Sequence, residues 1–153
     1  MITYRRAIFS DAEKLAEIRA IFLKEAGNIT SDADKIFIER ANLEYFKKAL
    51  CDETFLSWLA LDNEEIIATS GLSFSVVPPY TQVLDGKVAY IMNMYTLPTY
   101  RKRGIGTELL KRVIDEAKQL GYKKITLDAT KIGKPLYEKY GFKDLHDVMV
   151  FFV

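Results

Sequence analysis

The chain has 153 residues, of which 49% are hydrophobic and 28% are charged, and its formal net charge is +1. This length and balance are typical of one globular domain with a buried core rather than of a disordered chain. A dedicated nucleic-acid binder needs a strongly basic face, so the near-neutral charge argues against that function. Any site that binds an anion must therefore depend on a few neighbouring groups rather than on the overall charge of the protein.

The cysteine and histidine content excludes several kinds of site. Cys51 is the single cysteine and His146 the single histidine, so no internal disulfide, cysteine-based zinc site or multi-histidine metal cluster can form. We expect Cys51 to be a small buried side chain near a helix end. The N-terminus carries charges where a signal peptide has an apolar core, and no apolar run approaches a membrane span. We therefore expect a cytoplasmic protein that binds neither membrane nor metal.

The N-terminal quarter predicts a strand followed by a helix. The strand is expected at residues 2–7. Ser10 and Glu13 then form an S-x-x-E capping box, and apolar residues recur behind it at helical spacing on one face. Gly27 is expected to end this helix.

A second helix and three strands follow in the middle of the chain. Ser31 or Asp32 is the expected cap of the helix, whose apolar positions continue to residue 50. The strands are expected at 54–62, 66–77 and 88–96, with a Pro-, Asp- and Gly-containing loop at 78–87 before the last of them. That last strand has little polarity on either side, which suggests a central position covered on both faces.

The C-terminal part predicts one strong helix and a more varied ending. The helix at 105–120 carries apolar residues along one side and is ended by Gly121. A strand at 123–130, a short helix at 134–140 closed by Gly141 and a terminal strand at 148–153 follow. The element order β-α-α-β-β-β-α-β-α-β predicts an α/β fold: a mixed sheet with helices on its faces, in a single domain over residues 1–153.

The segment YRKRGIGTELL (100–110) lies between the central strand and the strongest helix. A helix N-terminus offers unpaired N–H groups and partial positive charge, and Gly104 and Gly106 leave room for an anion to approach the backbone. These are the parts of a phosphate or pyrophosphate cradle. The same residues also fit an alternative interpretation, a surface turn whose cationic side chains are solvated. The segment is not a P-loop, and Leu109 occupies the third glycine position of the dinucleotide fingerprint.

Three pieces of the sequence, in this order, together resemble the GNAT superfamily of acyl-CoA-dependent N-acetyltransferases. AYIMNMYTLPTY (89–100) looks like the central splayed strand of that family. RKRGIG (101–106) matches its pyrophosphate-binding pattern [RQ]-x-x-G-x-[GA], and LYEKYGF (136–142) is similar to its signature L-Y-x-x-x-G-F. The N-terminal half carries no diagnostic residues, but its element order agrees. The resemblance implies a GNAT-like fold.

The resemblance also implies how acetyl-CoA would be bound. The family places coenzyme A between two diverging parallel strands, here 88–96 and 124–130. The pyrophosphate would be held by five backbone N–H groups, with help from two side chains, and the pantetheine arm would pair with the central strand like an added strand. The N–H groups are those of Arg103, Gly104, Ile105, Gly106 and Thr107, the side chains are Arg101 and Lys102, and the paired residues are Met94 and Thr96.

For catalysis, the resemblance implies roles for Met94 and Tyr137. The Met94 N–H would stabilise the oxygen of the reacting thioester. Tyr137 would act as the general acid toward the leaving sulfur, although it could instead be a packed tyrosine whose hydroxyl bonds to backbone. Tyr140 is interpreted as a packing residue.

The sequence departs from the family pattern at several positions. Thr130 and Gly133 stand where many members have Asn and Ala. Members with a carboxylate base often carry it on the central strand, where this chain has Tyr90. Asp128 on the neighbouring strand is the nearest acidic candidate for a base, and an ordered water or Tyr90 could serve instead.

The acceptor pocket is expected among the first two helices and the loops 26–34 and 77–87. Aromatic residues could line it, or could be plain core: Trp58, Phe74, Tyr80 and Tyr90. Three lysines could form a rim for the adenosine 3′-phosphate, or a solvated face: Lys123, Lys124 and Lys134.

These observations lead to one expected function and two alternatives. The expected function is transfer of an acetyl group from acetyl-CoA to a primary amine of a small molecule or peptide, by direct attack in a ternary complex. A non-catalytic acyl-CoA-binding or sensor module on the same fold is the first alternative. An enzyme that uses a different acyl group is the second. Family members are often dimers, so a homodimer is a possible assembly.

Overall fold

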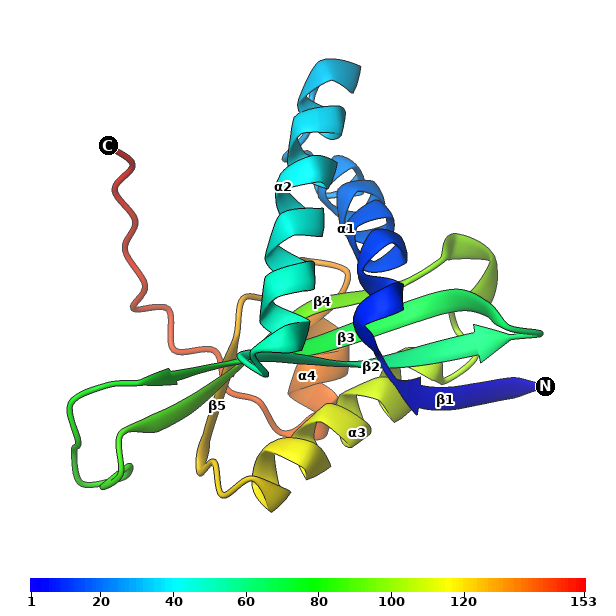
Figure 1. The fold of residues 1–153 in the computed structure, drawn as a ribbon. Helices are drawn as coiled ribbons and strands as arrows, with labels where there is room; N and C mark the ends of the chain where they lie inside the picture. The colour runs from blue at the N-terminus through cyan, green and yellow to red at the C-terminus, as the bar shows by residue number, and fades with distance from the viewer.

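One five-stranded mixed sheet forms the centre of the computed structural model, which describes residues 1–153 (Figure 1). The strands are β1 (Ile2–Arg6), β2 (Phe55–Asp62), β3 (Glu65–Val76), β4 (Lys87–Thr96) and β5 (Lys124–Leu127). They are ordered β1-β2-β3-β4-β5, and every neighbouring pair is antiparallel except β4 and β5, which are parallel. The predicted α/β fold class is confirmed.

Four helices cover the two faces of this sheet. α1 (Ala12–Glu25) and α2 (Asp32–Cys51) lie on one face, and α3 (Ile105–Gln119) and α4 (Lys134–Tyr140) lie on the other (Figure 1). Short 3₁₀ turns at Phe9–Asp11 and Pro98–Tyr100 lead into α1 and away from β4. None of these helices combines the length and the apolar character that crossing a membrane requires.

The core is divided between the two faces of the sheet. On the α1–α2 face, Leu15 and Phe46 pack with Leu59 of the sheet. On the α3–α4 face, Val113 packs in a second cluster with Leu72. The helices are thus held to the sheet by the apolar stripes that their sequences show, because burying those stripes removes apolar surface from water.

The start of α1 differs from the prediction, whereas the start of α2 agrees with it. The predicted capping box at Ser10 and Glu13 is wrong, because a 3₁₀ turn precedes α1. Asp11 is the N-cap residue of α1 but makes no side-chain hydrogen bond to that helix; its carboxylate accepts one from Ile8 N at 2.8 Å, at the start of the 3₁₀ turn. At α2, Ser31 Oγ accepts from Asp34 N at 3.1 Å, which confirms Ser31 as the cap.

Two further expectations about the chain are wrong. Cys51 is exposed: it is the last residue of α2, and the residues that this helix buries are Phe46 and Ala49. No strand forms at 148–153, where the apolar side chains are exposed and Met149 is 95% accessible. Apolar and β-branched composition favours a strand, but a strand also needs an edge that takes up its backbone hydrogen bonds, and none pairs with this segment.

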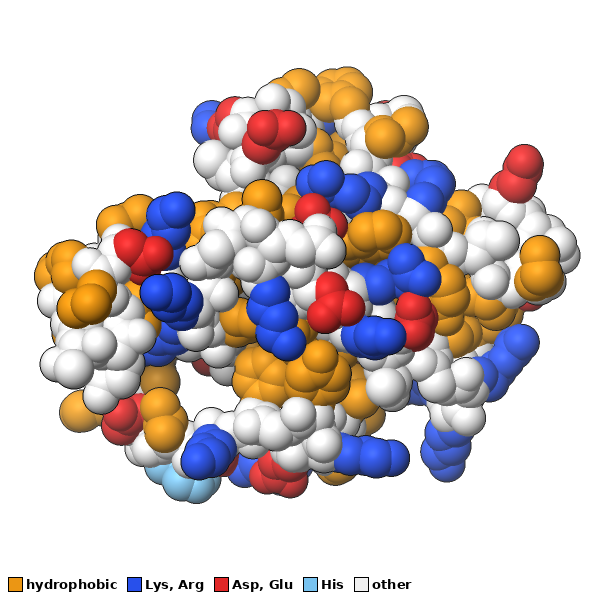
Figure 2. Space-filling model, turned by 90° about the horizontal axis from the view of Figure 1, so that it is seen from below, with side chains coloured by type: hydrophobic (Ala, Val, Ile, Leu, Met, Phe, Trp, Pro, Cys, Tyr) orange, Lys and Arg blue, Asp and Glu red, His pale blue; other side chains and the backbone are white.

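The charges on the α3–α4 face are mixed. Figure 2 shows Lys and Arg side chains spread across this face with Asp and Glu side chains between them. Several of these cations have acidic partners on the same helix, as Arg112 has in Glu108 at 2.8 Å. This face therefore lacks the continuous basic patch that a phosphate backbone would require.

Candidate active site

The site begins where β4 and β5 separate. Their parallel pairing ends at Ile91 and Leu127, so the last residues of β4, from Met92 to Thr96, have no strand on that side. On the other side, the register with β3 shifts between Thr69 and Gly71, and Asn93 adopts a positive φ of 56°. This is a β-bulge, which bends a strand and redirects its side chains. The predicted divergence of the two parallel strands is confirmed.

A cavity of about 790 Å³ lies at this separation. Its walls come from α1 and the loop after it, from β4 beyond its first three residues, from the turn before α3 and the start of that helix, from the segment after β5, and from α4. It lies within the size range of pockets that hold small molecules and cofactors. Most of the predicted site residues line it: Met94, Thr96, Arg101, Lys102, Gly104, Ile105, Gly106, Thr107 and Tyr137.

The turn before α3 presents free backbone N–H groups. Glu108 N is the first amide of the helix that donates within it, to Gly104 O at 3.1 Å, so the amides of residues 103–107 have no acceptor in the protein. Gly104 has a φ of 80°, a conformation that favours glycine. Unpaired amides at the positive end of a 15-residue helix form a ready anion site.

At Gly106, the absence of a side chain keeps the cavity open rather than allowing an unusual backbone conformation. A Cβ at this position would lie 3.7 Å from Leu136 Cδ2 and 3.9 Å from Thr96 Oγ1, both ordinary contact distances. The fold itself would therefore accept a methyl group there. A longer side chain would extend into the cavity, because Gly106 lines it. The residues present thus fit a bulky anion that approaches the backbone closely.

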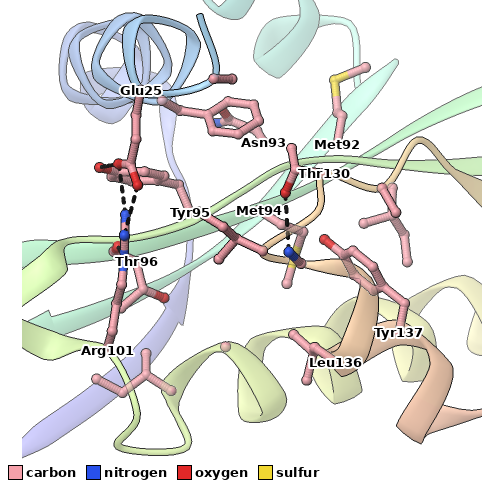
Figure 3. A pocket seen from close by; sticks show the side chains of 18 of the residues that line it. Glu25, Met92, Asn93, Met94, Tyr95, Thr96, Arg101, Thr130, Leu136 and Tyr137 are labelled. Carbon is pink, nitrogen blue, oxygen red and sulfur yellow. Dashed lines mark hydrogen bonds and ion pairs between the residues drawn. The ribbon is translucent and has the colours of Figure 1, made fainter.

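Of the three cations in the turn, Arg101 is engaged within the protein (Figure 3). Its guanidinium lies 2.7 Å from Glu25 Oε1, and its Nε donates to Thr96 O at 2.9 Å. Tyr95 completes the group, because its hydroxyl donates to Glu25 Oε2 at 2.5 Å. Lys102 and Arg103 are exposed. Sequence reasoning missed Glu25 and Tyr95, since nothing local links the end of α1 to this turn.

The Glu25 cluster shifts the pKa values of its members. Hydrogen bonds from Arg101 and then Tyr95 lower the pKa of the Glu25 carboxyl, so it stays ionised near neutral pH. Burial, followed by the hydrogen bond to Glu25, raises the pKa of Tyr95 to about 12. The cluster is therefore a stable ion pair that ties α1 to the turn.

Tyr137 reaches the cavity from α4. In Figure 3 its hydroxyl points toward Thr130 and Met94. The side chain is buried, its ring meets Phe142 edge-on at 6.0 Å between centroids, and burial raises its pKa to about 12. The hydroxyl makes no hydrogen bond to backbone, which argues against a purely structural role. Tyr140 packs near Phe142, at 6.4 Å, as its interpretation as a packing residue suggests.

Thr130 and Gly133, the two residues that depart from the family pattern, stabilise the start of α4. Thr130 Oγ1 accepts a hydrogen bond from Gly133 N at 3.1 Å, directly before the helix. A Cβ on Gly133 would lie 3.0 Å from Tyr137 Cε2, so a larger residue there would push the tyrosine ring. Thr130 and Gly133 therefore fix the position from which Tyr137 enters the cavity.

Tyr90 and Asp128 form a pair on the wall opposite α3. The Tyr90 hydroxyl donates to Asp128 Oδ2 at 2.7 Å. Burial and then this hydrogen bond raise the pKa of Tyr90 to about 12. Tyr90 thus stays protonated near neutral pH and is unsuited to accept a proton, whereas Asp128 offers a carboxylate at the cavity.

The predicted aromatic wall does not assemble. Of its four members, only Tyr90 lines the cavity. Trp58 Nε1 donates to Glu116 of α3 at 2.9 Å, and Phe74 packs on Tyr122 at 4.8 Å, so both belong to the α3–α4 face. Tyr80 lies outside the cavity, as does the rest of the loop 77–87. The loop after α1 does contribute, through Ala26 and Asn28.

The three lysines that could form a rim or a solvated face line a second hollow, not the main cavity. This hollow lies between β5, α4 and the C-terminal segment. Lys134 forms an ion pair with Asp144, and Lys124 lies over the Tyr80 ring at 5.2 Å. Lys123 lies in the same wall.

Asn93, at the bulge of β4, was also missed by sequence reasoning. It is almost fully buried, and neither atom of its side-chain amide has a hydrogen-bond partner. Its backbone carbonyl accepts from Thr69 Oγ1 at 2.8 Å. An asparagine within an apolar strand was the available signal, because Asn is depleted in strands and tolerates positive φ.

Comparisons with known proteins point to one family. The family model described as "Acetyltransferase (GNAT) family" matches residues 13–142. A crystal structure of a predicted acetyltransferase with acetyl-CoA from Clostridium acetobutylicum has a TM-score of 0.91 and 38% sequence identity, and the match covers 99% of this chain and 96% of that one. A GCN5-related N-acetyltransferase from Ralstonia eutropha has a TM-score of 0.90 and 25% identity, with 99% of each chain covered.

Curated relatives agree over shorter stretches. The thialysine N-epsilon-acetyltransferase of Mus musculus is 30% identical over 83 residues, which are 52% of this chain and 46% of the relative. The chain spans about half the length of the curated relatives it matches.

Proposed function

The chain belongs to the acetyltransferase (GNAT) family, and on that basis we propose that it transfers an acetyl group from acetyl-CoA to a primary amine by direct attack in a ternary complex. One observation carries the proposal. The unpaired amides before α3 and the free hydroxyl of Tyr137 face the same cavity, on either side of the unpaired end of β4.

The turn before α3 would hold the pyrophosphate of acetyl-CoA. The amides of residues 103–107 are free to donate, and Gly104 and Gly106 keep the approach to them open. Lys102 would supply an exposed positive charge, while Arg101 stabilises the turn through Glu25. The pantetheine arm would pair with β4 at Met94 and Thr96, where the strand has lost its neighbour. The similar Clostridium protein, whose structure is described as containing acetyl-CoA, supports this assignment.

Acetyl-CoA would supply the acetyl group: its C–S bond breaks as the amine nitrogen forms the new C–N bond, and the coenzyme leaves as a thiol. The Met94 N–H would donate to the oxygen that becomes more negative during this step. Removing one such donor from other enzymes lowers the rate by roughly 10²- to 10³-fold. Because the backbone provides this group, the Met94 side chain is free to pack in the core.

Tyr137 would supply the proton that the departing sulfur takes up. Its pKa of about 12 keeps the hydroxyl protonated over the physiological range, so the donor form is always present. Asp128, which already accepts from Tyr90, would receive the proton that the amine loses, directly or through a water. The acceptor amine would enter from the α1 side, and it is a small molecule or a peptide end.

A thiol-release assay with acetyl-CoA and a panel of amines tests the proposal. We expect release above the hydrolysis background with at least one amine, together with a product heavier by one acetyl group in mass spectrometry. Saturable acetyl-CoA binding without turnover on any amine would favour the non-catalytic binding module. Faster turnover with a longer acyl-CoA would favour a different acyl group.

A further inference from the structure

Arg19 of α1 lines the cavity without an acidic partner. It is partly buried, and no carboxylate lies within ion-pair distance of its guanidinium. The other arginine of the same cavity, Arg101, is neutralised by Glu25 at 2.7 Å. Arg19 is therefore a partly buried positive charge in the cavity wall that the protein itself leaves without an ion-pair partner.

The surroundings of Arg19 make this arrangement unfavourable without a ligand. Burial lowers the pKa of its guanidinium, and the groups that oppose this effect are the hydroxyls of Tyr90 and Tyr45 rather than a carboxylate. Asp128, another residue of the cavity wall, accepts a hydrogen bond from the Tyr90 hydroxyl at 2.7 Å and forms no ion pair with Arg19. Buried charges in proteins are normally paired, so a partly desolvated guanidinium in a cavity wall suits an incoming anion.

The position of Arg19 indicates whether that anion would belong to acetyl-CoA or to the acceptor. The pyrophosphate cradle lies at the N-terminus of α3, on the opposite face of the sheet from α1. Arg19 lies on the α1 side, where the cavity wall also includes Phe22 and Asn28. An anion at Arg19 would therefore be part of the molecule that enters from the α1 side, which is the acceptor.

We propose that the acceptor is an amine that also carries an oxyanion, a carboxylate or a phosphate, and that Arg19 binds this group. A guanidinium matches either anion through paired N–H donors. This inference rests on the proposed acetyl transfer, because it names the class of acceptor for that reaction.

Matched pairs of amines test the inference. Lysine is compared with 1,5-diaminopentane, thialysine with its decarboxylated diamine, and O-phosphoethanolamine with ethanolamine, each by thiol release from acetyl-CoA. We expect the anionic member of at least one pair to have a kcat/KM higher by roughly 10- to 100-fold, the value of a hydrogen-bonded charge. A preference within the first two pairs identifies a carboxylate, and a preference within the third identifies a phosphate.

Variants of two arginines test whether Arg19 causes the preference for the anionic amine. In Arg19→Gln the ratio of kcat/KM within the preferred pair should fall to near one, and Arg19→Lys should restore part of it. Arg40→Gln is the matched control, because Arg40 is an exposed arginine of α2 outside the cavity, and it should keep the wild-type ratio. Calorimetric titration without acetyl-CoA should show the same loss of affinity for the anionic amine in Arg19→Gln.

The outcomes separate this inference from the proposed function. If amines are acetylated but the member of each pair that lacks the anionic group reacts as well as or better than the anionic member, the role of Arg19 is overturned and acetyl transfer stands. A preference that survives in Arg19→Gln would do the same. If no amine of any class releases thiol, the acetyl transfer is overturned, and the acceptor class with it.

Discussion

Glu25 Oε1 lies 2.7 Å from the Arg101 guanidinium, although the two residues are 76 positions apart in the chain. The contact joins the C-terminal end of α1 to the turn that precedes α3. It thereby holds the end of α1 against the turn before α3, across the cavity. Both side chains are about one-third exposed, so the pair is partly shielded from solvent.

A double-mutant cycle on this pair should show a measurable coupling. For Glu25→Gln, Arg101→Gln and the double variant, we expect a coupling of about 1 kcal/mol in the free energy of unfolding at neutral pH. The pKa of Glu25 is lowered in the folded state, so its contribution is present above its unfolded pKa and is lost as the pH falls through the folded value. Urea unfolding at pH 7 and at acidic pH measures both effects.

The pair of Lys14 and Glu17 provides a reference for that cycle. It is a local contact on the surface of α1, at 3.0 Å, and we expect a coupling of only a few tenths of a kcal/mol. A Glu25–Arg101 coupling no larger than this reference, or one that does not decrease in acid, would contradict a structural role for the pair.

Gly106→Leu should weaken acetyl-CoA binding without unfolding the protein. The leucine side chain would extend past Leu136 into the cavity. We therefore expect the dissociation constant of acetyl-CoA to rise roughly 10- to 100-fold, which corresponds to the usual free-energy cost of overpacking. Gly106→Ala is the control, because a methyl group meets only ordinary contacts. Calorimetry and thermal melting measure affinity and fold. Tight binding by the leucine variant would place the diphosphate elsewhere.

Tyr137→Phe should lower kcat by roughly 10²-fold while the dissociation constant of acetyl-CoA stays near its wild-type value. The variant keeps the ring that packs against Phe142 and removes only the hydroxyl that faces the cavity. Tyr140→Phe, on the same helix, should have nearly wild-type kcat. Steady-state kinetics with a saturating amine distinguishes the two, and wild-type turnover in Tyr137→Phe would remove its role as the acid.

Alkaline pH should destabilise the fold between about pH 10 and 12. The pKa of Tyr137 is raised to about 12 in the folded state, against about 10 in an unfolded chain. Its contribution is complete below the unfolded pKa and is lost as pH rises through the folded one. The two-unit difference corresponds to on the order of 2–3 kcal/mol. Tyr95 and Tyr90 are raised to about 12 as well and should add to this loss.

Tyr137→Phe also isolates one part of the alkaline effect. The variant should lose less stability than the wild type between pH 10 and 12, measured as the midpoint of urea unfolding at each pH. Identical pH dependence in the two proteins would mean that the Tyr137 hydroxyl is not desolvated in the folded state.

Local sequence signals were sufficient where the structure itself is local. The apolar stripe of α3 and the glycines before it predicted both the helix and its free N-terminal amides, because helix periodicity and capping depend on neighbours in the chain. The parallel neighbours β4 and β5 were implied by the family resemblance, which rests on short motifs in the chain. The terminal strand was wrong for the opposite reason, since a strand depends on a partner edge that its own residues do not encode.

By itself, the sequence determined the order of helices and strands apart from the terminal strand, the family, and the glycine turn with free amides before α3, because these depend on periodicity, on glycine conformation and on short motifs. Only the tertiary structure decided that Glu25 neutralises Arg101 and that Arg19 is left unpaired in the same cavity. Both facts depend on which charges meet across distant parts of the chain, and electrostatic pairing acts through space rather than along the sequence.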